Sequence, residues 1–102
     1  MRYDKLVRDK IPEIIESTGK KAICRTLTET EYKEYLEKKL DEEVAEFHGS
    51  KSVEELADIL EVVYALIEIQ GRSVFELGSM RRRKLFERGA FGKRICLIEV
   101  EE

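Results

Sequence analysis

The sequence has few of the residues that build disulfide, zinc or nucleophilic sites. It contains two cysteines, Cys24 and Cys96, and a single histidine, His48, in 102 residues. Two cysteines so far apart form neither a disulfide scaffold nor a zinc site. The sequence also has no Ser-His-Asp arrangement and no phosphate-binding glycine loop of the Walker type, which argues against a covalent hydrolase and a Walker NTPase.

Long apolar runs are missing as well. No window approaches the 18 apolar residues that a membrane-spanning helix needs. The first five residues include Arg2, Asp4 and Lys5 and lead into more charges, not into an apolar stretch, so we expect no signal peptide. With thiols kept reduced, the expected location is the cytoplasm. The length predicts a single domain, residues 1–102.

Charge, in contrast, is abundant and segregated. Charged residues make up 40% of the chain, and the formal net charge is only -3. Residues 1–28 carry a net charge of +3, residues 29–68 carry -9, and residues 69–102 carry +3. An acidic middle is therefore flanked by two basic ends, a polarity that suggests a functional site.

Turn and capping residues divide the chain into helices and two short strands. Ser or Thr followed three residues later by Glu is a capping-box pattern that starts a helix, and glycine typically ends one. These signals predict helices at Pro12 to Thr18, Thr28 to about His48, Ser52 to about Gln70, and Ser73 to Arg88. Residues 21–27 and 94–100 alternate roughly between apolar and polar and are predicted to be strands. The expected fold is mostly α, an antiparallel helical bundle with a small two-stranded β appendage that would bring Cys24 and Cys96 near each other if the strands pair.

The helix expected at residues 53–70 is apolar over more than half of its circumference. Such a helix must be buried on several sides. A chain of this length has too few other helices to cover it, so we expect a homodimer or a higher homo-oligomer that shares this helix.

Two neighbouring predicted helices place acids where apolar side chains are expected. At the helical period, Glu43 falls in the apolar stripe of the first helix and Glu46 at its border. On the next helix Glu55 falls within the apolar sector and Asp58 at its edge. A buried carboxylate costs several kcal/mol unless it is paired, protonated or bound to a metal. Taken singly, Glu55 could serve only as the capping partner of Ser52, and Glu46 could be a solvated residue.

Taken together, the four acids indicate a metal site. A short turn makes the two helices antiparallel neighbours, so both i,i+3 pairs converge. Oxygen-only ligands suit hard cations, here Mg2+ or Mn2+, and Mg2+ commonly bridges protein carboxylates to substrate phosphates. The predicted metal ligands are Glu43, Glu46, Glu55 and Asp58, and the predicted substrate is phosphorylated. Glu43 or Glu46 is the candidate general base.

The spacing Glu43-x-x-Glu46 and Glu55-x-x-Asp58 resembles the metal motif of the MazG-like all-α nucleoside triphosphate pyrophosphohydrolases. The segments Lys5 to Pro12 and Arg88 to Phe91 resemble a small single-domain branch related to phosphoribosyl-ATP pyrophosphatase. Ala90 stands where that branch has a second glycine. The resemblance implies Mg2+-dependent hydrolysis of a nucleoside triphosphate between the α- and β-phosphates, in the role of clearing non-canonical nucleotides. It also implies that the four acids hold the metal.

The basic ends supply candidate phosphate contacts. A triphosphate carries about four negative charges, more than metal ions alone balance, and arginine suits bidentate contact with phosphate. Because consecutive helical residues point in all directions, at most two of Arg81 to Lys84 can face one site. The predicted substrate-binding residues are Lys5, Arg8, Lys39, Arg88 and Lys93.

Two other classes of function are compatible with parts of the sequence. In one, the chain is a non-catalytic helical dimer that binds nucleic acid or a protein through the basic segment 81–94. In the other it is a catalytically silent regulator that resembles an antitoxin. The net charge is negative, no nucleic-acid-binding signature is present, and the first of these readings leaves Glu43 and Glu55 unexplained, so the enzyme is preferred.

Overall fold

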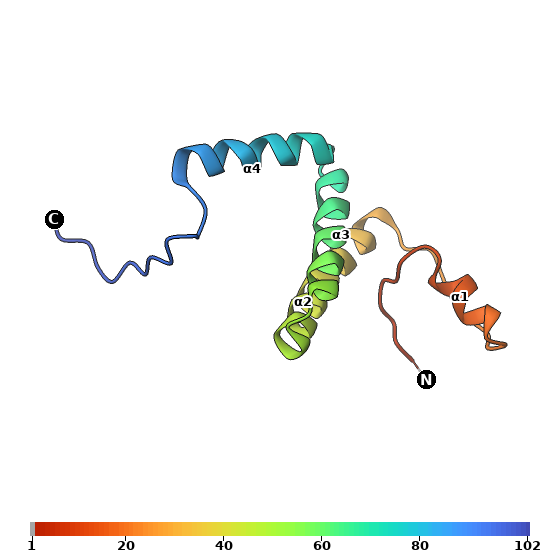
Figure 1. The fold of residues 1–102 in the computed structure, drawn as a ribbon. Helices are drawn as coiled ribbons and strands as arrows, with labels where there is room; N and C mark the ends of the chain where they lie inside the picture. The colour runs from red at the N-terminus through yellow and green to blue at the C-terminus, as the bar shows by residue number, and fades with distance from the viewer. Residues whose placement is uncertain (1) are drawn as a thin grey trace.

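The computed structural model describes residues 2–102, and four helices hold most of them (Figure 1). The mostly α fold class is confirmed. In the described part of the chain, no helix combines the length and the apolarity needed to cross a membrane. The helices are α1 (Ile11–Ser17), α2 (Glu29–Ser50), α3 (Val53–Ile69) and α4 (Val74–Arg88).

Side-chain caps start the three long helices where the sequence predicts. At α2 the Thr28 hydroxyl accepts a hydrogen bond from the Glu31 amide at 3.2 Å, and the Glu31 carboxylate accepts one from the Thr28 amide at 3.0 Å. Ser52 caps α3 and Ser73 caps α4 in the same way, each through its hydroxyl. These bonds satisfy amides that have no partner within the helix.

The turn between α2 and α3 is only two residues long. Helix α2 continues through Gly49 to Ser50, past its predicted end near His48. Lys51 ends it in the left-handed conformation at φ 59°, and Ser52 then starts α3. The short turn makes α2 and α3 antiparallel neighbours, as predicted.

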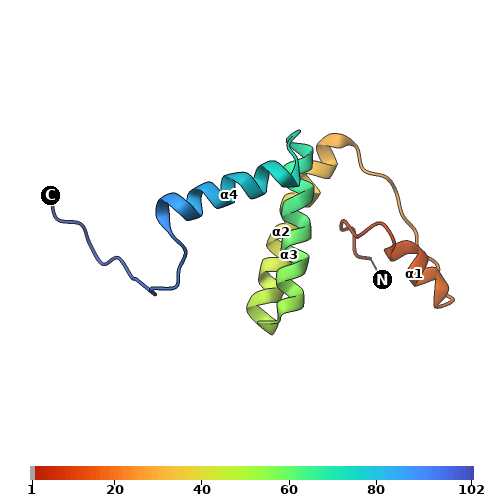
Figure 2. The ribbon, with the colours of Figure 1, turned by 45° about the horizontal axis from the view of Figure 1, so that its top comes forward.

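Packing is concentrated between α2 and α3. Leu36 on α2 and Val62 on α3 are the buried apolar residues, at 2% and 8% exposure. Helix α4 touches α3 near their junction and then leads away, and α1 contacts no other helix among the described residues (Figure 2). The chain spans 62 × 32 × 24 Å, so a single copy is an extended molecule with a very small core.

The outer face of α3 is uncovered in this single chain. Val53 is 79% exposed, and Leu56 and Leu60 are each 47% exposed. The prediction that this helix is buried on several sides is therefore not met within one copy. The chain's own core leaves these three apolar side chains of α3 exposed.

The predicted β appendage is wrong for the single chain. Residues 21–27 and 94–100 form no strand within residues 2–102. The two segments lie at opposite ends of the molecule in Figures 1 and 2, so they cannot pair with each other. Cys24 and Cys96, both exposed, are correspondingly not neighbours. A two-stranded ribbon is marginal unless it packs on helices, and neither segment has such a support here.

Candidate metal centre

Three carboxylates from α2 and α3 meet between the two helices. Glu43 of α2 and Glu55 and Asp58 of α3 each offer an oxygen that lies within 4.8 Å of the other two. Glu43 is only 6% exposed, whereas Glu55 and Asp58 are half-buried. The i,i+3 spacing puts both α3 acids on one face, and the short turn holds that face against α2.

Two oxygens of this cluster are buried without a hydrogen-bond partner among the described residues. They are Oε2 of Glu43 and Oε2 of Glu55. The amide of Glu55 bonds to the Ser52 hydroxyl at 3.3 Å, but the carboxylate does not return a bond to the Ser52 amide as Glu31 does at Thr28. The Glu55 carboxylate is thus free of the capping role. Buried, unpaired acceptors of this kind are rare and favour a bound proton or cation.

The electrostatics of the cluster agree with its geometry. Burial raises the pKa of Glu43, and Glu46 adds to the rise while Lys39 opposes it. Burial also raises the pKa of Glu55, with further contributions from the carboxylates of Glu46, Asp58 and Glu43. The ionised forms therefore repel one another, and a divalent cation would relieve that repulsion.

Glu46 lies at the outer side of the cluster. It is exposed, and one of its carboxylate oxygens lies within 4.8 Å of carboxylate oxygens of Glu42 and Glu43. Glu43 therefore belongs to two acidic groups, one facing α3 and one facing solvent. All four acids predicted as ligands lie in the same region, with Glu46 the most accessible to solvent.

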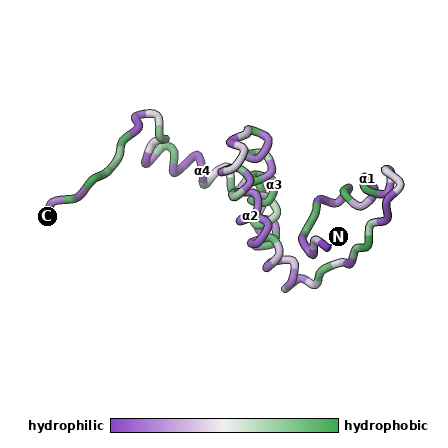
Figure 3. The backbone as a smooth tube through the Cα atoms, turned by 90° about the horizontal axis from the view of Figure 1, so that it is seen from below, coloured by the Kyte–Doolittle hydropathy of each residue, from purple (hydrophilic) through white to green (hydrophobic). Residues whose placement is uncertain are grey.

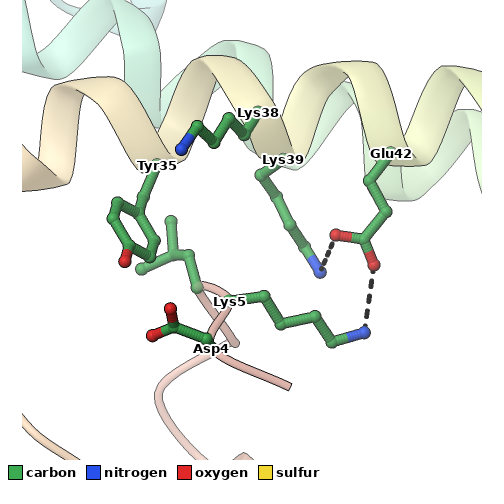
Figure 4. A pocket seen from close by; sticks show the side chains of 7 residues that line it. Asp4, Lys5, Tyr35, Lys38, Lys39 and Glu42 are labelled. Atoms are coloured by element: carbon green, nitrogen blue, oxygen red, sulfur yellow. Dashed lines mark hydrogen bonds and ion pairs between the residues drawn. The ribbon is translucent and has the colours of Figure 1, made fainter. Parts of the chain in front are cut away.

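Three cations form ion pairs with acids of this region, including Glu42. Arg8 Nη2 lies 2.6 Å from Asp58 Oδ1, and Lys39 Nζ lies 3.3 Å from Glu43 Oε1. Figure 4 shows Lys5 and Lys39 on either side of the Glu42 carboxylate, at 3.0 and 3.6 Å. Burial tends to raise the pKa of Glu42, but these two lysines hold it below its usual range, and the Glu42 hydrogen bond raises the pKa of Lys5. The N-terminal segment is thus held against the acidic centre by Lys5 and Arg8.

A cavity of about 350 Å³ lies beside the carboxylates. Its size falls in the range of small-molecule sites, roughly 300–1,000 Å³. Its lining includes Arg8, Lys39, Glu43 and Asp58, four of the residues that the sequence singles out. The other lining residues are Leu6, Val7, Asp9, Tyr32, Leu36, Glu61, Val62, Ala65 and Glu68.

Two acids that the sequence does not single out, Glu61 and Glu68, line the cavity together with Asp58. The spacing of these acids could have indicated a shared face, because residues 58, 61, 65 and 68 follow the i,i+3,i+7 spacing of one helix face. The acidic wall of the cavity is therefore longer than the four predicted ligands.

Arg88 and Lys93 are not brought to the cavity within one chain. Both are exposed, one at the end of α4 and the other in the tail that follows it. Figure 1 shows this part of the chain well away from the α2–α3 pair. Lys5, Arg8 and Lys39 are the predicted cations that the structure does place near the acids.

Comparison with known proteins adds little about activity. No family model matches the chain, and no solved structure matches it significantly. An uncharacterized protein of Mycolicibacterium smegmatis is 51% identical to it over 45 residues, which are 44% of this chain and 46% of that protein. The match thus spans less than half of the relative, and the functional assignment depends on the site itself.

Proposed function

We propose that this chain is a Mg2+-dependent nucleoside triphosphate pyrophosphohydrolase that releases a nucleoside monophosphate and pyrophosphate. The observation that carries the proposal is the pair of buried, unpartnered oxygens on Glu43 and Glu55, which converge with Asp58 from two helices. The acidic motif and the resemblance of the N-terminal segment supply the reaction class. The cavity beside the acids supplies space for part of a nucleotide.

The donor set fits a hard divalent cation. Glu43, Glu55 and Asp58 provide only carboxylate oxygens, which suit Mg2+ or Mn2+ and not zinc or copper. Glu46, next to Glu43, would complete the set from the solvent side. The chemistry that such an ion supplies when bound is neutralisation of phosphate oxygens and a lowered pKa for a water molecule.

The chain's own residues divide the remaining tasks. Glu46, which is exposed beside the buried acids, is the proposed acceptor of the proton of the attacking water, with Glu43 as the other candidate. Arg8 and Lys39 line the cavity and carry the charge that phosphate oxygens require. Arg8 pairs with Asp58 and Lys39 pairs with Glu43, and these ion pairs hold both cations beside the acidic cluster.

The active form is proposed to be a homodimer or a higher homo-oligomer. Among residues 2–102, the two buried apolar residues form a very small core, and the apolar face of α3 is exposed. A second copy that covers this face would complete a helical bundle. The proposed location remains the cytoplasm, which agrees with two free, exposed cysteines.

Pyrophosphate release tests the function directly. The purified chain is incubated with a panel of canonical and modified nucleoside triphosphates, with Mg2+ and without it. We expect release only with Mg2+, and we expect Asp58→Asn to reduce it by at least about a hundredfold, as loss of a group that stabilises the transition state does. Glu54→Gln is the matched control, because Glu54 is an exposed neighbour of Glu55 that is absent from the cluster. Unchanged release by Asp58→Asn would rule out the proposed metal centre.

The alternative function is a non-catalytic helical dimer that binds nucleic acid or a protein through the basic segment 81–94. The exposure of that whole segment is the observation in its favour. This alternative function gives no role to the unpartnered oxygens of Glu43 and Glu55. Salt-dependent binding of nucleic acid without any release of pyrophosphate would support this alternative.

A further inference from the structure

Two segments of this chain have the character of β-strands but no strand partner. Residues 20–27 and 95–102 make no backbone hydrogen bond to any of the described residues. Figure 3 shows apolar stretches along the C-terminal tail and between α1 and α2. Ile23 is 90% exposed, and in the tail Ile95, Leu97, Ile98 and Val100 are 79%, 75%, 85% and 72% exposed.

We infer that these segments pair with each other between two copies of the chain, residues 21–25 of one with residues 95–99 of the other. They lie at opposite ends of one molecule, so pairing within a chain is excluded by geometry (Figure 1). A two-fold axis between two copies gives each tail the other copy's N-terminal segment, and it forms two identical pairings in one closed dimer. The unpaired backbone groups and the apolar side chains are then covered together.

Charge complementarity identifies the second copy as the occupant. Residues 20–25 include Lys20, Lys21 and Arg25 and no acid, whereas residues 99–102 include Glu99, Glu101 and Glu102 and no base. In an antiparallel pairing, Lys20 and Lys21 face the stretch that holds the partner's Glu99 and the partner's Glu101. Within one copy the two segments lie too far apart for this match (Figure 1).

The charges also determine the strand direction. Parallel pairing of residues 21–25 with 95–99 would place Lys20 opposite Arg94 and would leave Lys21 without an acid opposite it. Antiparallel pairing places Lys21 opposite the partner's Glu99 and moves Arg94 away from both lysines. The register that pairs Lys21 with the partner's Glu99 also pairs Ile23 with the partner's Leu97 and Cys24 with the partner's Cys96. This register joins the most apolar stretch of each segment.

The pairing has a consequence for the site, and this step depends on the proposed function. The register places the partner's Arg94 opposite Thr26, two residues before the cap of α2. The partner's Lys93 then lies near the start of α2, one helical turn from Tyr32 of the cavity. The tail therefore carries the partner's Lys93 toward a cavity that a single chain leaves without it.

Cysteine cross-linking tests the pairing on the full chain. Mild oxidation with copper phenanthroline, followed by a non-reducing gel, is applied to Cys24→Ser, to Cys96→Ser and to a mixture of the two. Neither variant alone is expected to form a covalent dimer, and the mixture is expected to form one, because each variant keeps one half of the Cys24–Cys96 pair. The covalent dimer should disappear when the mixture is oxidised in urea. A covalent dimer from either variant alone, or none from the mixture, would overturn the register.

Charge reversal gives a second and independent readout. Lys21→Glu and Glu99→Lys should each raise the dimer dissociation constant on the order of tenfold, because two cross-strand pairs change from attraction to repulsion. The double variant should return to the wild-type value in sedimentation equilibrium, and Lys10→Glu, outside both segments, should not change it. Single reversals without effect, or a double variant no better than the singles, would contradict the pairing. Neither test uses hydrolysis, so failure of the pairing and failure of the proposed function are separate outcomes.

Discussion

Replacing Glu43 by glutamine should change the stability of this protein in opposite directions without and with Mg2+. Glutamine has nearly the same shape as glutamate but carries no charge. In the metal-free protein the substitution removes a carboxylate that is 6% exposed and has an unpartnered oxygen. With Mg2+ present, it removes a proposed ligand.

The expected magnitudes follow from the surroundings of Glu43. An unsatisfied buried acceptor costs about 1–3 kcal/mol. Lys39, 3.3 Å from the other oxygen, offsets part of that cost, so Glu43→Gln should stabilise the metal-free protein by about 1 kcal/mol at neutral pH. In the wild type, a Mg2+ concentration a hundredfold above the dissociation constant should add about 2.7 kcal/mol, and the variant should lose most of this gain.

The pH dependence gives a further signature of the same group. Because burial raises the pKa of Glu43, the folded state binds its proton more tightly than the unfolded state does. The metal-free wild type should therefore gain stability as the pH falls from neutral through the raised pKa toward the usual carboxyl range. The advantage of Glu43→Gln should be largest at neutral pH and should vanish by the lower end of that window.

Urea unfolding followed by circular dichroism at 222 nm measures these free energies. Protein concentration must be matched, because dimer dissociation shifts the midpoint. Glu54→Gln, which replaces an exposed acid next to the site, should behave like the wild type. A Glu43→Gln variant that is less stable than the wild type without metal, and that gains as much from Mg2+, would refute the reasoning.

Three other substitutions test separate parts of the structure. Leu36→Ala removes the most buried apolar side chain and should cost about 3 kcal/mol in urea unfolding, and a loss below about 1 kcal/mol would show that α2 and α3 do not pack as described. Thr28→Ala removes a complete capping box and should cost about 1 kcal/mol, with the loss of helix seen first at the start of α2 by hydrogen exchange. Arg8→Gln frees Asp58 of its ion pair and should strengthen Mn2+ binding about two- to fivefold in calorimetry, whereas weaker binding would mean that Arg8 assists the metal and does not compete with it.

Local signals in the sequence predict the helices well because each is carried by a few neighbouring residues. The cap residues Thr28, Ser52 and Ser73 start helices in the structure, and the short turn after Gly49 makes α2 and α3 antiparallel. Because the short turn makes the two helices neighbours, acids on their facing sides can be assigned to one cluster from the sequence. The convergence of Glu43, Glu55 and Asp58 was therefore predictable.

Features that depend on distant parts of the chain were not predictable in this way. The strands expected at residues 21–27 and 94–100 have suitable composition, but pairing needs a neighbour that a single extended copy does not provide. The ion pair of Arg8 with Asp58 joins residues 50 positions apart and has no local signal. The sequence does not single out Glu61 and Glu68, because acids along one helix face are usually solvated, whereas here both line a cavity.

Titration with Mn2+ followed by electron paramagnetic resonance tests the central claim, that carboxylates of α2 and α3 hold a divalent cation, most directly. Free Mn2+ gives a sharp signal that is lost on binding, so the number of bound ions per chain is read without any assumption about substrate. We predict saturable binding by the wild type and by Glu54→Gln, and strongly weakened binding by Asp58→Asn and by Glu55→Gln. Equal binding by all four proteins, or none by the wild type, would contradict the proposed metal centre.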